Sequence, residues 1–135
     1  MASQQTPGQA ARRHIDPFQM RAAVTEVLPW LDDATARQPE RAVLAAAVRL
    51  SLRVLPDVAP GNSVEVRVPP FAAVQCVAGP RHTRGTPPNV IETDPRTWLE
   101  LATGRLAWAD AVATARVSAS GTRADISALL PVVRL

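Results

Sequence analysis

The chain has 135 residues, of which 47% are apolar, and a formal net charge of +3. A chain of this length can bury a core of its own without a metal or a disulfide, and its apolar content argues against disorder. All fifteen basic residues are Arg and they are scattered among Asp and Glu. Nucleic acid binding needs a clustered basic face, so this distribution argues against it.

The sequence predicts a cytoplasmic protein with one folded domain. Residues 1–15 are rich in Gln, Ala and Gly and are expected to form a flexible tail before a single domain at 16–135. The N-terminus lacks the apolar core of a signal peptide, and no apolar run approaches the about eighteen residues that a membrane span needs. Because Cys76 is the single cysteine, no internal disulfide can form.

Two helices are predicted in the first half of the chain. Asp16 suits an N-cap, and apolar residues recur at helical spacing over 17–28, where we expect the helix to break or kink because Pro29 lacks a backbone N–H. The second helix is predicted over 39–55, with a broad apolar face of Val, Leu and Ala, and is expected to end at Pro56. A helix this apolar must pack against a wide partner such as a sheet.

Extended segments follow the two helices. Val alternates with charged residues over 64–68, the pattern of a strand with one solvated face. The Pro pair after it cannot join a paired ladder, and further strands are predicted at 71–77 and 89–93. Between them, residues 79–88 are basic and rich in Gly and Pro and are expected to form a loop.

A helix, a glycine stop, a second helix and a strand are predicted next. Asp94 suits an N-cap before a helix over 95–103, and Gly104 suits a left-handed residue after it. A shorter helix is expected over 107–114, and a strand over 115–120. A short helical turn is also expected near the C-terminus, stopped by a proline.

The order Asp-x-x-x-Trp-x-x-Leu-x-x-Gly-x-Leu, from Asp94 to Leu106, precedes a small amphipathic helix and a strand that ends in Gly121. This arrangement resembles the second half of a sterol carrier protein-2-like domain. The closing segment 121–131 is similar to the bacterial branch of that family. The resemblance is strongest over 64–131.

The resemblance implies an α+β fold, with a mixed or antiparallel sheet of about four to five strands and helices packed mainly on one face. The N-terminal helix pair would precede it. The implied function is non-catalytic binding or transfer of a fatty acyl chain, an acyl-CoA or a sterol-like lipid, in a tunnel between helices and sheet, with no cofactor. The alternative is an interaction module without a lipid ligand, whose partner is a second copy in a homodimer or an enzyme.

The apolar residues of the motif supply the expected lipid-binding site. Its members are Val66, Trp98, Leu101, Leu106, Trp108, Ala111, Val112, Val117 and Leu129. The two indoles could line a cavity or serve simply as core anchors. Small side chains beside bulky ones either leave a groove or interlock into a solid core, and the pattern does not decide between these outcomes.

Polar candidates are few. Arg81 and Arg84 suit an anionic head group, or they solubilise a hairpin tip. Cys76 and His82 could form a thiolate–imidazole pair, but no third group orients them, so we interpret Cys76 as a buried structural thiol. One Cys and two His do not make a zinc site. No catalytic or metal-binding residue is therefore predicted.

Overall fold

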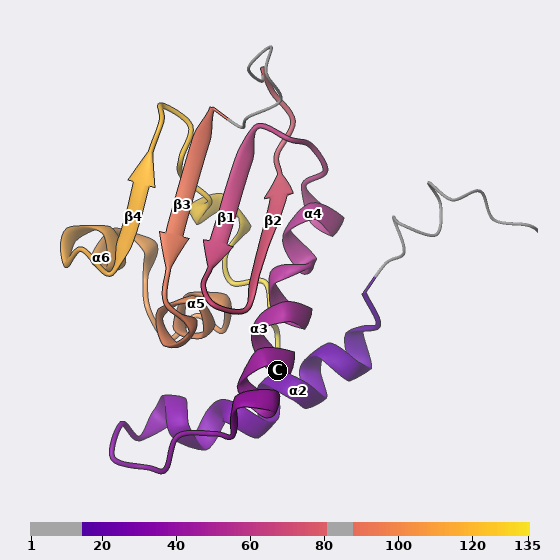
Figure 1. Ribbon diagram of the computed structural model, residues 1–135, viewed down its shortest axis with the longest axis vertical. Helices are drawn as coiled ribbons and strands as arrows, with labels where there is room; N and C mark the ends of the chain where they lie inside the picture. Colours follow the sequence, from indigo (N-terminus) through magenta and orange to yellow (C-terminus); the bar gives the residue numbers. More distant parts are fainter. Residues whose placement is uncertain (1–14, 81–87) are drawn as a thin grey trace, which may run out of the picture.

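The chain folds into a four-stranded mixed sheet with helices packed on one side. The computed structural model describes residues 15–80 and 88–135, and its strands lie in the order β2, β1, β3, β4 (Figure 1). Strand β1 is parallel to β3, whereas the other two pairs are antiparallel. The strands are β1 (Val64–Val68), β2 (Ala72–Cys76), β3 (Asn89–Thr93) and β4 (Val117–Ser120). The α+β class expected from the sequence is confirmed.

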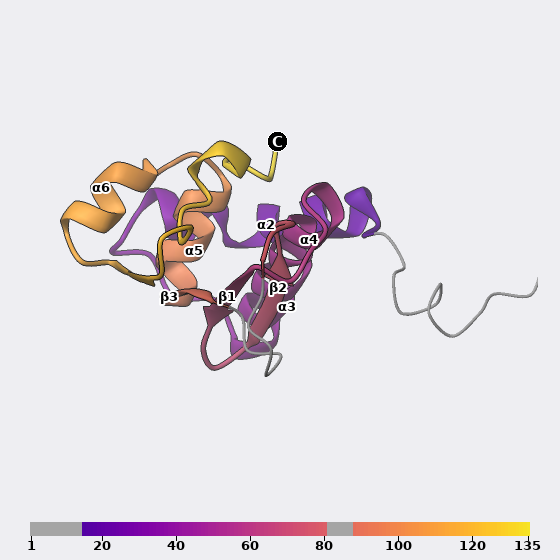
Figure 2. The same cartoon turned by 90° about the horizontal axis from the view of Figure 1, so that it is seen from above.

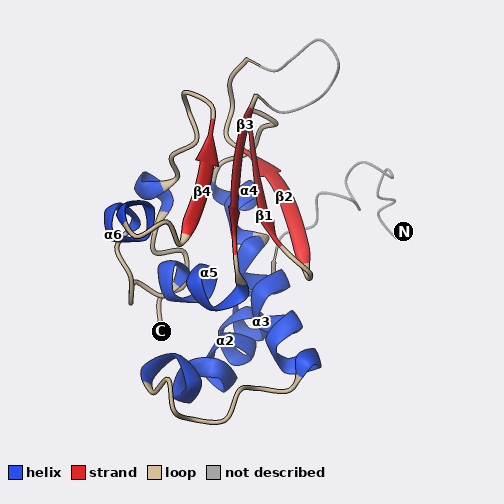
Figure 3. Ribbon diagram, turned by 60° about the vertical axis from the view of Figure 1, so that its left-hand side comes forward, coloured by secondary structure: helices blue, strands red, loops and turns tan. Residues whose placement is uncertain are grey.

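Helices precede, connect and follow these strands. They are α2 (Pro17–Asp32), α3 (Arg41–Leu52), α4 (Val54–Val58), α5 (Pro95–Ala102), α6 (Trp108–Ala113) and the 3-10 turn η1 (Ser127–Leu129). Helices α3 and α5 lie between the strands and α2 (Figure 3), and α2 contacts both of them. Seen from above, α5, α6 and the C-terminal segment lie on the same side of the sheet (Figure 2).

Valine and charged residues alternate along β1, and this alternation determines which face of the sheet is buried. The three valines of β1 have no exposed surface, whereas Arg67 is exposed and forms an ion pair with Glu65 on the opposite face. The parallel register places Ile91 beside Val66, so the apolar face continues into β3. Helix α5 packs on this apolar face, because Trp98 belongs to the same core cluster as Val66 and Ile91.

The two predicted Asp caps are confirmed. The Asp16 carboxylate accepts the backbone N–H of Phe18 at 2.9 Å, and the Asp94 carboxylate accepts that of Thr97 at 2.9 Å. In both helices a proline occupies the first turn, where its missing N–H costs nothing. Gly104 follows α5 with a φ of 80°. It therefore has the left-handed conformation expected of a glycine stop.

The predicted helix end before Pro29 is wrong. Helix α2 continues through Pro29 to Asp32. A proline this close to the end of a helix removes one helical hydrogen bond but leaves the preceding turns intact. Leu31 is buried on the same face as Val27, so packing of the last turn offsets the lost hydrogen bond.

Other boundaries also differ from the prediction, and three have a clear cause. The segment 39–55 forms two helices, because α3 ends at Leu52 and Pro56 lies in the first turn of the short helix α4, where proline is tolerated. Ala115 has a φ of 59°, outside the extended region, so β4 starts two residues later than expected. Val77, with a φ of 68°, likewise ends β2 one residue early.

Candidate apolar ligand site

Trp98 joins helix α5 to helix α3 in the centre of the molecule. Its side chain has no exposed surface, and its indole N–H donates to Ser51 Oγ at 2.9 Å. The Ser51 hydroxyl donates to the carbonyl oxygen of Ala47, one turn earlier in α3, at 2.6 Å. The only polar atom of the indole is therefore satisfied, and Trp98 serves as a core anchor between the two helices.

Five of the residues predicted to bind lipid are buried in the same core. They are Val66, Trp98, Leu101, Ala111 and Val117, with exposed fractions between 0% and 5%. A side chain beside an empty space of water size would expose surface to that space. The described part of the chain is thus closely packed around these five side chains, as in the solid core that the sequence left open as the alternative to a groove.

The other predicted lipid-binding residues lie at the rim of the core. Leu106, Trp108 and Leu129 are half-buried and pack against it. Val112 is 44% exposed, so the prediction that it faces inward is wrong. Helix α6 buries Ala111, and the next residue of a helix is turned by about 100°. That rotation carries Val112 away from the core.

The C-terminal segment closes this end of the core. The backbone N–H groups of Val132 and Val133 both donate to the carbonyl oxygen of Ala102, each at 3.0 Å. A Cβ atom added to Gly104 would lie 3.6 Å from Pro131, so this segment passes close to the turn after α5. Because the Val133 side chain is buried, the segment forms one wall of the apolar interior.

Charged side chains on the outside of α5 pair with one another. Glu100 forms ion pairs with Arg116, the residue before β4, and with Arg96 at 3.4 Å. Arg116 also donates to Thr97 Oγ1 at 3.2 Å. Among the described residues, no buried side-chain N or O atom lacks a hydrogen-bond partner. These contacts tie α5 to the residue before β4.

Cys76 is fully buried in β2, and burial raises the pKa of its thiol from 9.0 to about 11. At neutral pH it is a thiol rather than a nucleophilic thiolate, in agreement with the structural interpretation. His82 and the proposed head-group residues Arg81 and Arg84 lie outside the described residues. Within the described part of the chain, no His, Cys, Asp and Glu side chains gather in a group that could hold a metal ion.

Sequence reasoning did not single out Ser51 or Arg96. Ser51 could have been found, because it is a polar residue in the buried row of an otherwise apolar helix and must have a partner. Arg96 donates to the carbonyl oxygens of Trp30 and Leu31, more than sixty positions earlier. No local pattern marks such a contact.

A comparison with protein families shows which family this fold belongs to. Residues 40–132 match the family model SCP_3, described as bacterial SCP ortholog. The chain belongs to this bacterial sterol carrier protein family. The match contains all four strands and helices α3 to α6, whereas α2 precedes it. No curated protein matches the chain.

Membership of the sterol carrier protein family favours a lipid-binding or carrier role over a catalytic one. It also agrees with the resemblance found at the Asp94–Leu106 motif, which lies within the matched residues. In the part of the chain that the structure describes, no helix is long and apolar enough to cross a membrane.

Proposed function

We propose that this sterol carrier family member binds a fatty acyl chain, an acyl-CoA or a sterol-like lipid between the apolar face of the sheet and helices α3 and α5. It carries this ligand in the cytoplasm without catalysis. The observation that carries the proposal is one continuous apolar cluster. It runs from Val66 and Ile91 of the sheet through Leu101 and Trp98 of α5.

Ligand entry requires the interior to open. Trp98 and Ala111 touch no open space, so an acyl chain has to displace side chains or a covering segment. The half-buried residues Leu106, Trp108 and Leu129 form the rim that the ligand meets first. In this proposal, Arg81 and Arg84 provide the positive charge for a carboxylate or phosphate head group.

Binding of a fluorescent long-chain fatty acid tests the proposal. Delipidated full-length protein should give a saturable signal, and palmitate, an acyl-CoA or a sterol should displace the probe. Native mass spectrometry should show co-purified lipid on protein that was not delipidated. Absence of saturable binding for all three ligand classes, together with lipid-free native protein, would refute the carrier proposal.

The close packing around Trp98 and Ala111 favours a second candidate function, an interaction module without a lipid ligand. Such a module presents its outer surface to a second copy or to an enzyme and uses its interior only for stability. Sedimentation of the delipidated protein separates this candidate from the first. A self-associating protein that takes up no lipid is the result that an interaction module predicts.

A further inference from the structure

Helix α2 covers α3 and α5 from the side that faces away from the strands (Figure 3). Its buried residues belong to the same apolar cluster as Trp98; they are Met20, Val24, Val27 and Leu31. The family match begins at residue 40, after this helix. Helix α2 therefore lies outside the matched residues and closes their apolar interior from outside.

Polar contacts hold the C-terminal end of α2. Arg96 donates from Nη2 to the carbonyl oxygens of Trp30 and Leu31, at 3.0 and 3.1 Å, and its guanidinium lies 4.6 Å from the Trp30 ring centroid. Arg105 donates to both carboxylate oxygens of Asp32, at 2.6 and 3.1 Å. The Asp32 side chain is 57% exposed, and water weakens an ion pair of this kind.

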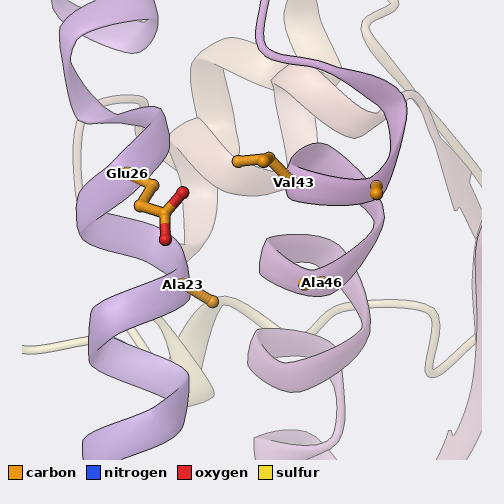
Figure 4. Close-up of a pocket in the computed structure, with 5 residues that line it drawn as sticks. Ala23, Glu26, Val43 and Ala46 are labelled. Atoms are coloured by element: carbon orange, nitrogen blue, oxygen red, sulfur yellow. The ribbon is translucent and has the colours of Figure 1, made fainter.

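The packing of α2 on α3 leaves a groove. Its volume is about 220 Å³, and it is lined by Ala23, Glu26, Ala42, Val43 and Ala46. Ala23 and Glu26 extend from α2 toward α3 (Figure 4). Small side chains on both helices leave this space unfilled, so α2 forgoes dispersion contacts that a tighter interface would make.

The connection from α2 to α3 is able to act as a hinge. Residues 33–40 contain no helix or strand. The Asp33 carboxylate accepts the Thr35 backbone N–H at 2.9 Å, which forms a local turn. Because this turn is built from its own residues, it can persist while α2 moves relative to α3.

From these contacts we propose that α2 is the gate of the apolar ligand site. When the Arg96 and Arg105 contacts release, α2 swings about residues 33–40 and uncovers the α3–α5 surface next to Trp98. An acyl chain then enters between these helices, and the return of α2 shields it from water. This inference rests on the proposed carrier function and adds the route by which the ligand enters the closed core.

Locking α2 onto α3 tests the gate. The double variant Ala23→Cys/Ala46→Cys places a thiol on each side of the groove, and a short bis-maleimide then links the two helices. Cys76 is buried and should not react. We expect the linked protein to bind the fluorescent fatty acid at least tenfold more slowly or more weakly than the same variant capped with N-ethylmaleimide, which modifies both thiols without linking them.

The possible results of this cross-linking experiment distinguish failure of the gate from failure of the carrier function. Equal binding by linked and capped protein overturns the gate and leaves the carrier function standing. Failure of the wild type to bind any lipid overturns both. Loss of binding only in the linked protein supports the gate.

A second variant tests the contact that holds the gate closed. Arg105→Gln removes the ion pair with Asp32 and should increase the rate of fatty acid association several-fold. Arg67→Gln is the matched control, because it removes an exposed ion pair with Glu65 from the open face of the sheet. Equal association rates in the two variants contradict the gate.

Discussion

At the scale of single residues, the hydrogen bond between Trp98 and Ser51 links α5 to α3 inside the core. Ser51→Ala leaves the buried indole N–H without a partner and should lower the free energy of unfolding by about 1–3 kcal/mol. Ser118→Ala is the control, because Ser118 is exposed on the sheet. Urea unfolding of both variants measures the difference.

A double-mutant cycle tests the cause of that loss. In Trp98→Phe/Ser51→Ala both partners of the hydrogen bond are removed, so Ser51→Ala should cost less in this background than in the wild type. Equal costs in the two backgrounds would show that the effect comes from the packing of Ser51 and not from its hydrogen bond.

The buried thiol makes stability depend on alkaline pH. Cys76 has a folded-state pKa of about 11 against an ordinary value of 9.0. Well below pH 9 the thiol is protonated in both states. As the pH rises from 9 to 11 the unfolded state loses its proton first, so the free energy of unfolding should fall by at most about 2–3 kcal/mol.

The composition of the chain allows this fall in the free energy of unfolding to be assigned to Cys76. The chain contains no Lys and no Tyr, the side chains that ordinarily titrate near pH 10. Cys76→Ala should therefore remove most of the decline between pH 9 and 11, at the cost of about 1 kcal/mol at neutral pH. A decline of the same size in the variant would show that another group is responsible.

Arg81 and Arg84 are expected to distinguish anionic from neutral ligands. Replacing both with Gln should weaken the binding of a fatty acid more than that of a neutral sterol, and the difference should shrink as salt is added, because salt screens exposed charges. Displacement titrations at low and high ionic strength measure this. Equal losses for both ligands would contradict a head-group role.

At the scale of secondary structure elements, the sequence correctly predicted the helix ends that depend only on neighbouring residues. The caps at Asp16 and Asp94 and the stop at Gly104 depend on a few neighbouring residues, and all three are confirmed. The continuation of α2 past Pro29 depends on the burial of Leu31 by other elements. That cause is tertiary, so the sequence of the helix alone does not reveal it.

The two helical prolines should respond differently to replacement. Pro29→Ala restores a backbone N–H inside α2 and should raise the free energy of unfolding by about 1 kcal/mol or more. Pro56→Ala should be neutral or slightly destabilising, because Pro56 lies in the first turn of α4 and proline restricts the unfolded chain. Thermal unfolding of the pair measures the difference, and equal shifts would contradict this account.

At the scale of the whole molecule, the sequence predicts the burial of the candidate site residues better than it predicts how tightly they pack. Trp98, Leu101 and Ala111 are buried as their helical spacing predicts. Whether large and small side chains interlock depends on how α5, α6, the sheet and the C-terminal segment meet. Strands β1 and β2 lie far from the other parts in the sequence, so periodicity carries no information about the space between them.

Substitution at Ala111 measures that space directly. Ala111→Leu adds three carbon atoms where the side chain has no exposed surface, and the resulting overpacking should lower the free energy of unfolding by about 1–3 kcal/mol. Ala113→Leu is the control on the same helix, because Ala113 is exposed. If a lipid occupies the interior beside α6, the Ala111 variant should also bind it more weakly than the control does. Unchanged or increased stability would reveal space beside Ala111 and place the ligand there without any movement of α2.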